Sequence, residues 1–140
     1  MEKQTYTYDE AFAKSLEYFK GDELAARVWV NKYAVKDSFG NIFEQSPEDM
    51  HWRIANEVAR VEAKYTNGLS AQELFDLLDH FKYIVPQGSP MTGIGNDHQV
   101  ASLSNCFVIG LDGEADSYGA IMRIDEEQVQ LMKRRGGVGH

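Results

Sequence analysis

Four helix start signals divide the first two thirds of the chain, and they constrain its fold more than any other feature. Residues 46–49 read Ser-Pro-Glu-Asp, in which serine can cap a helix, proline fits the first turn and two carboxylates meet the positive end of the helix dipole. Thr7 and Ser70 each precede a glutamate by three residues, which is the spacing of a capping box, and Asp22 can cap one more helix. We therefore expect four helices between residues 6 and 83.

Apolar residues at helical spacing follow each start signal and predict the helical core. The residues expected to face inward are Phe12, Leu16, Phe19, Leu24, Val28, Trp29, Met50, Ile54, Val58, Val61, Leu74, Phe75, Leu77, Leu78 and Phe81. The third helix should continue to about Tyr65, and residues 37–41 should form a turn that could be the tip of a small hairpin. Arg53 belongs to a charged row on the third helix that reads most simply as a solvent-exposed face.

The last third of the chain changes character. Residues 86–101 have no periodicity and are expected to form a long loop, which in a compact domain is usually functional or disordered. The apolar run around Cys106 predicts a short buried strand, and Asp116 is expected to cap a last helix of about 17 residues that ends in a glycine run. This strand has no partner among the expected elements. Because an unpaired strand edge invites pairing with another chain, we expect some self-association.

Composition and charge exclude several classes of function. An apolar content of 43% and a charged content of 26% are ordinary for a soluble globular domain. The net charge of −8 argues against a nucleic-acid-binding protein, and no apolar run approaches the roughly 20 residues that cross a bilayer membrane. A single cysteine and scattered histidines exclude an internal disulfide and a metal site of zinc-ligand spacing, and they favour a reducing, cytoplasmic setting.

Three segments of the last third could carry chemistry, although each also has a structural explanation. Cys106 reads most simply as a small buried hydrophobe, because no basic neighbour in the sequence would lower the pKa of its thiol. Glycines and hydroxyls in residues 88–96 could hold an anion, but their spacing fits neither a P-loop nor a dinucleotide fingerprint, and a connecting loop is the alternative. Residues 136–139 could be a glycine helix cap or a backbone that approaches a ligand closely.

The order of these segments changes their interpretation. Residues 88–95, 102–108, 116–117 and 135–139, taken together, resemble the large catalytic subunit of ribonucleotide reductase. The helical part resembles the all-helical N-terminal domain of that family at Trp29, Tyr33, Gly40, Pro47, Met50, Arg53, Ile54 and Ala55. The resemblance covers essentially the whole chain, and the cysteine strand with its preceding Ser-Pro loop is the more specific part.

The resemblance implies a mainly α fold with two parts. Residues 1–85 would be the helical N-terminal domain, and residues 86–140 would hold the first strand and helix of a ten-stranded α/β barrel that is incomplete here. The chain would be a truncated, N-terminal part of a ribonucleoside-diphosphate reductase, an enzyme that makes deoxyribonucleotides for DNA replication by radical reduction of the ribose 2′ carbon. Because the other catalytic cysteines would lie beyond His140, the fragment itself is expected to be inactive.

The resemblance also assigns roles to single residues. Cys106 would be one of two thiols that reduce the ribose and become a disulfide. The ribonucleotide substrate would be contacted by Ser89, by the backbone of Gly136 and Gly137, and by Asn105, which stands where some family members carry serine. None of these residues is expected to bind a metal ion.

The start of the last helix matches the effector-binding helix of the family. Asp116, Ser117 and Tyr118 would bind the deoxynucleotide specificity effector, and in many members this helix also pairs across a homodimer interface. The sequences of residues 88–95 and 104–108 look more like those of the adenosylcobalamin-dependent class than those of the class that uses a separate radical-generating subunit. Adenosylcobalamin would then be bound by the complete enzyme and not by this fragment, and a thioredoxin-type protein would return the cysteine pair to the dithiol.

Two other functions stay open on the residues alone. The chain could be a free-standing helical protein-interaction module whose residues 86–140 are disordered and dispensable. It could instead be a small nucleotide-binding domain that uses its two glycine segments, in which case the isolated chain would bind nucleotide measurably. A reductase fragment predicts neither strong binding nor catalysis by the isolated chain.

Overall fold

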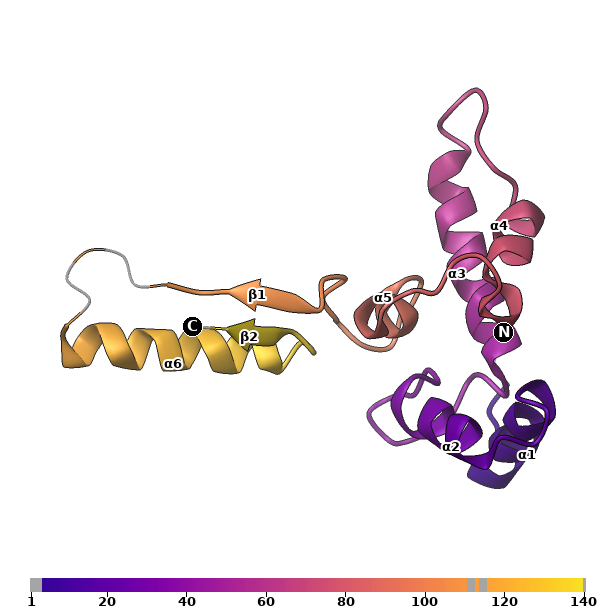
Figure 1. Ribbon diagram of the computed structural model, residues 1–140, viewed down its shortest axis with the longest axis horizontal. Coiled ribbons are helices and arrows are strands. Elements are labelled where there is room, and N and C mark those ends of the chain that lie inside the picture. The colour runs from indigo at the N-terminus through magenta and orange to yellow at the C-terminus, as the bar shows by residue number, and fades with distance from the viewer. Residues whose placement is uncertain (1–3, 111–112, 114–115, 140) are drawn as a thin grey trace.

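The chain forms a group of helices from which a small strand–helix–strand unit extends (Figure 1). The computed structural model describes residues 4–110, 113 and 116–139. Its elements are α1 Tyr8–Tyr18, α2 Glu23–Lys32, α3 Pro47–Glu62, α4 Ala71–Leu78, the 3₁₀ turn η1 Asp79–Phe81, α5 Gly88–Gly93, β1 Cys106–Val108, α6 Tyr118–Met132 and β2 Gly137–Gly139. In Figure 1, α1 and α2 lie together below α3 and α4, and α5 lies between these helices and the extended unit.

Local hydrogen bonds start three of the helices where the sequence predicts. The backbone N–H of Thr7 donates to Glu10 Oε2 over 2.8 Å, and the Glu10 N–H donates back to the threonine hydroxyl. Ser70 and Glu73 form the same reciprocal pair at the start of α4. Asp22 accepts from the backbone of α2. Each of these two capping boxes satisfies N–H groups that have no partner within the helix. The positions of these helix starts are therefore set by pairs of residues three apart in the sequence.

The start of α3 differs from its prediction in detail. Ser46 occupies the cap position, but its side chain makes no capping bond. Asp49 reaches back instead, and its Oδ2 accepts from the backbone N–H of Gln45 over 2.9 Å. The helix ends at Glu62, earlier than the expected Tyr65.

The core is formed by buried residues of α1 to α5 and of the segment between α2 and α3. Its buried members are Ala11, Trp29, Val30, Ala34, Ile42, Met50, Ile54, Ala55, Leu74, Phe75, Leu78 and Met91. The Trp29 indole donates to Met50 Sδ over 3.4 Å, which satisfies the one polar atom that the tryptophan brings into this core. The predicted inward positions of Leu24, Val28 and Val61 are wrong, since these side chains are 72%, 42% and 38% exposed. The buried face of α2 follows Ala26, Trp29 and Val30, which places Leu24 on the opposite side.

The turn at residues 37–41 is confirmed. Asp37 Oδ1 accepts from the backbone N–H groups of Phe39 and Asn41, over 2.8 and 2.9 Å. The flanking chain is joined by an isolated antiparallel bridge between Lys36 and Ile42 and forms no longer strand pair. The hairpin is therefore limited to the turn and single bridges within the described residues.

The expected loop over residues 86–101 is wrong in its first part, which forms the short helix α5. Proline at the third helical position is tolerated there, because the first-turn N–H groups have no partner within the helix. Six residues are too few to show a helical period in the sequence, which is why the pattern indicated a loop.

The strand around Cys106 is neither buried nor unpartnered, contrary to expectation. It pairs in parallel with β2, in a register that sets Cys106 opposite Gly137 and Val108 opposite Gly139. Cys106 is exposed, and Val108 is 90% exposed. Parallel strands need a crossover connection, and α6 supplies it. Residues 137–139 of the glycine run therefore form a strand that pairs with β1, a role that the sequence did not predict.

The last helix begins one residue later than predicted and stays open to solvent. Ser117, and not Asp116, is the cap, with its hydroxyl oxygen accepting from the Ala120 N–H over 3.1 Å. None of its described residues is buried, and Ile121 and Val129 are exposed. The described part of the chain contains one two-stranded sheet, so the ten-stranded barrel is not part of this structure. No helix within the described ranges is long and apolar enough to cross a membrane.

Candidate functional site

Five of the residues proposed for substrate chemistry lie together where α5 meets the two strands. The backbone N–H of Ser89 donates to Asn105 Oδ1 over 2.7 Å, and the N–H of Gly137 donates to the Asn105 carbonyl over 2.6 Å. Cys106 follows directly and lies opposite Gly137 in the sheet, while Gly136 precedes that strand. Segments about 50 residues apart in the sequence thus meet at Asn105, directly before Cys106.

Ser89 is held firmly within the protein. It is 2% exposed, and its hydroxyl donates to the carbonyl of Arg135 over a long 3.4 Å. The arginine side chain continues this connection, because its Nη1 donates to the Lys32 carbonyl at the end of α2 over 3.1 Å. The start of α5 is therefore tied to both the glycine strand and the helical part.

Asn105 uses both ends of its amide. While Oδ1 accepts from Ser89, Nδ2 donates to Oε1 of Gln87, a residue that the sequence did not single out. No motif could have found this glutamine, because an exposed glutamine before a Gly-Ser-Pro segment has no distinctive local signal.

The Cys106 thiol is free and accessible at the start of β1. Its side chain projects from a strand whose neighbour at this position has no side chain, since the partner residue is Gly137. A reagent or substrate therefore meets little obstruction from β2. Within the residues that the structure describes, no group of three or more histidine, cysteine, aspartate or glutamate side chains could hold a metal ion.

Gly136 has a structural reason to be glycine that is separate from any substrate. A Cβ atom placed there would lie 2.7 Å from Cε2 of Phe107 and 3.2 Å from the carbonyl of Leu131. The Phe107 ring therefore covers the glycine and packs β1 against the end of α6.

Alanine at position 136 is expected to destabilise the strand pair by about 1–3 kcal/mol, because it forces the Phe107 ring aside in a packed contact. Amide hydrogen exchange at Ile109, whose N–H donates to Gly139, should become faster. The control is Gly139→Ala, where a new Cβ meets nothing within 4 Å. Equal effects of the two substitutions would contradict the role of Phe107.

The residues proposed for the effector lie at the other end of the unit. Ser117 caps α6, and Asp116 and Tyr118 beside it are exposed. Ser117 also lines a hollow of about 320 Å³ with Arg123 and Glu127. In Figure 1 this end of α6 lies farthest from α5, so the structure separates the predicted effector residues from the Cys106 group.

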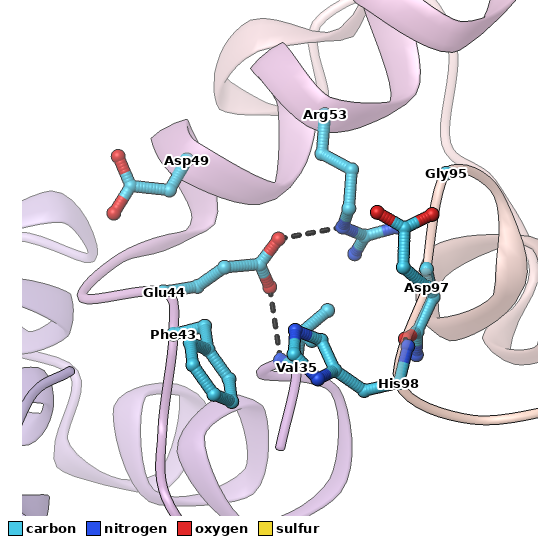
Figure 2. Close-up of a pocket in the computed structure, with 9 residues that line it drawn as sticks. Val35, Phe43, Glu44, Asp49, Arg53, Gly95, Asp97 and His98 are labelled. Carbon is cyan, nitrogen blue, oxygen red and sulfur yellow. Dashed lines mark hydrogen bonds and ion pairs between the residues drawn. The ribbon is translucent and has the colours of Figure 1, made fainter. Parts of the chain in front are cut away.

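A second pocket, of about 260 Å³, lies between α3 and the segment after α5 (Figure 2). Its centre is Glu44, which is only 5% exposed and lies 2.6 Å from Arg53 Nε. The other carboxylate oxygen of Glu44 accepts from the Val35 N–H over 3.0 Å. The imidazole of His98 stacks on Phe43 with ring centroids 4.1 Å apart.

Arg53 joins this pocket to α5. Its Nη2 donates to the Met91 carbonyl over 2.7 Å, and its Nη1 donates to the Ile94 carbonyl. The prediction of a solvent-exposed row is therefore wrong for this residue, whose side chain is mostly buried. Arg53 therefore holds α5, the helix that carries Ser89, against α3.

A buried polar cluster lies on the other side of α3. His51 is fully buried, and its Nδ1 lies 3.4 Å from the hydroxyl of Tyr18, which donates to Asp79 Oδ1 over 3.1 Å. Burial lowers the pKa of His51 to about 4, and the Asp79 carboxylate opposes this shift without cancelling it. His51 is therefore neutral in the folded chain near pH 7.

This pKa predicts a loss of stability in mild acid. The unfolded chain takes up a proton at His51 near pH 6.5, whereas the folded chain takes it up only near pH 4. Stability should therefore fall by about 3 kcal/mol as the pH falls through this window, and this term should level off below it. Urea unfolding at several pH values measures the fall. His51→Phe should flatten the curve, and His80→Gln, which changes the half-exposed neighbouring histidine, should keep most of it.

Comparison with known families adds an independent finding. Residues 19–96, more than half of the chain, match the family model described as ribonucleotide reductase, all-alpha domain. The matched segment contains α2, α3, α4 and α5 with Ser89, and it ends before Asn105, Cys106 and the glycine strand. Searches among curated proteins and among solved structures gave no match.

Proposed function

The chain belongs to the family of the ribonucleotide reductase all-alpha domain, and we propose that it acts within a large subunit that reduces ribonucleoside diphosphates at the 2′ carbon. The family match supports membership of a reductase. The observation that carries the proposed reaction is the exposed Cys106 thiol, with Ser89, Asn105 and the glycine strand gathered beside it.

The proposed reaction balances with Cys106 as one of two reducing thiols. Reduction replaces a ribose C–O bond by a C–H bond and releases the oxygen as water. Two thiols supply two electrons and two protons and become one disulfide. The chain contains one cysteine, so the second thiol and the radical-carrying cysteine would come from outside these 140 residues. An exposed sulfur suits this role, since both the ribose and a second thiol need to reach it.

The groups around the thiol suit a ribonucleotide. The Asn105 amide can pair with ribose hydroxyls and phosphate oxygens, because each of its ends is engaged only once, whereas the N–H groups of Ser89 and Gly137 already donate to Asn105. They offer no broad apolar surface for a corrin ring, so none of them is assigned to adenosylcobalamin. Adenosylcobalamin is proposed only for the complete enzyme, because the sequences of residues 88–95 and 104–108 resemble those of the class that depends on it.

The far end of the unit is proposed as the effector site. Asp116, Ser117 and Tyr118 would face the deoxynucleotide, and the adjoining hollow holds Arg123, which lies 3.1 Å from Glu127. A second copy of the chain packed along α6 would cover its exposed apolar side chains, which agrees with a homodimer. A thioredoxin-type protein would reduce the cysteine pair in the cytoplasm.

The test is a reduction assay on the complete protein that carries this chain. It is incubated with CDP and a dithiol, with and without adenosylcobalamin and without any partner subunit, and dCDP is measured. Product that depends on the cobalamin would support both the reaction and the class. Product that appears only with a radical-generating partner subunit would keep the reaction and overturn the class. No product under either condition, with other ribonucleoside diphosphates and with triphosphates also unreduced, would overturn the reaction.

A further inference from the structure

Gln87 lies just before α5 and does not cap it. It occupies the cap position with no capping hydrogen bond of its own, and its side chain is directed to Asn105 instead. There its Oε1 accepts from Asn105 Nδ2, while Asn105 Oδ1 accepts from the Ser89 N–H over 2.7 Å. The first-turn N–H of Ser89, which has no partner within a helix, is thus satisfied from a different segment.

We propose that Gln87 is a positioning residue that fixes the orientation of the Asn105 amide, and through it the places of Ser89 and Cys106. This inference rests on the proposed reductase function, because it assigns Gln87 a part in presenting the site to substrate. Gln87 does not itself touch Cys106, so it acts through Asn105.

The chemistry of the amide explains how Ser89 and Gln87 together hold one orientation. Asn105 has an acceptor end and a donor end, and a half-turn of the amide would set Nδ2 against the Ser89 N–H, so that two donors would face each other. The backbone N–H of Ser89 can only donate, so it selects this orientation, and the Gln87 oxygen accepts from the opposite end of the amide and holds it in place.

Backbone pairing fixes the other side of Asn105. The N–H of Gly137 donates to the Asn105 carbonyl over 2.6 Å, so this residue joins α5, β1 and β2 directly before the thiol. With both amide ends engaged once, the second lone pair of Oδ1 and the second hydrogen of Nδ2 are left for a ribonucleotide. Gln87 thereby sets the direction in which these two groups point.

The experiment substitutes Gln87 in the complete protein that carries this chain. Gln87→Leu removes the acceptor, Gln87→Glu keeps an acceptor oxygen, and Gln72→Leu is the control, since Gln72 pairs with Asp76 on α4 far from the site. Two quantities are measured. These are kcat/KM for ribonucleotide reduction, and deuterium exchange of a peptide covering α5.

Loss of one hydrogen bond predicts about a fivefold fall in kcat/KM for Gln87→Leu and faster exchange at the start of α5. Gln87→Glu should restore the slow exchange, and Gln72→Leu should change neither quantity. On an Asn105→Ala background, Gln87→Leu should cost nothing more, because the two residues act as one unit.

Wild-type kinetics for Gln87→Leu, or a full additional loss on the Asn105→Ala background, would overturn the inference. If the complete protein reduces no ribonucleotide, the proposed function fails, and exchange alone then decides the positioning role. Unchanged exchange in Gln87→Leu overturns it, whereas faster exchange that Gln87→Glu reverses supports it.

Discussion

Replacement of Arg53 by alanine is expected to lower the free energy of unfolding by about 3–5 kcal/mol. The substitution leaves the Glu44 carboxylate, which is only 5% exposed, with a single backbone N–H as its charge-stabilising partner. It also takes the guanidinium away from the carbonyls of Met91 and Ile94, so the end of α5 loses its attachment to α3. Urea unfolding followed by circular dichroism measures the change.

A matched control separates this buried pair from an exposed one on the same helix. Arg60 pairs with Glu57 at 2.6 Å, but the arginine side chain is 63% exposed and the glutamate 36% exposed, so Arg60→Ala should cost less than about 1 kcal/mol. Glu44→Leu combined with Arg53→Met should recover only part of the loss, because no charge is then left buried but the Val35 N–H and the carbonyls of Met91 and Ile94 still lose their partners. Similar losses for Arg53→Ala and Arg60→Ala would contradict the anchoring role.

The contrast between these two arginines explains what the sequence could predict. The helix starts depend on residues three apart, such as Thr7 with Glu10, and they were predicted because both partners lie in one short window. The partners of Arg53 are Glu44, on a segment without helix, and carbonyls about 40 residues later. Spacing within α3 carries no information about them, so the charged row was assigned to solvent.

The strand pair was missed for a similar reason. Glycine has low β propensity, and nothing local indicates that residues 137–139 form a strand. The pairing depends on α6 returning the chain beside β1 and on Phe107 covering Gly136, both of which are long-range features. Ser89, Asn105 and Cys106 were proposed together through family resemblance, and their proximity is a property of the fold. Gln87 had neither a motif nor a resemblance to indicate it.

Replacement of Cys106 by serine is expected to reduce dithiol-driven ribonucleotide reduction by the complete protein about a thousandfold or more. A serine hydroxyl cannot form a disulfide, so it cannot supply its share of the two electrons that the 2′ carbon requires. The fold should remain, since Cys106 is exposed and its strand partner Gly137 has no side chain for it to pack against. The change in unfolding free energy should stay within about 0.5 kcal/mol.

Two measurements decide whether the sulfur reacts or merely occupies the site. Iodoacetamide should modify Cys106 readily in the 140-residue chain, which contains no other thiol, and Cys106→Ser should abolish this labelling. In the complete protein, steady-state dCDP formation should be lost in Cys106→Ser while substrate binding persists, because Ser89 and Asn105 hold their contacts without the sulfur. Undiminished turnover in this variant would place the reducing thiol elsewhere. Cys106 would then be an exposed thiol beside a glycine strand, and the family membership, which rests on residues 19–96, would be unaffected.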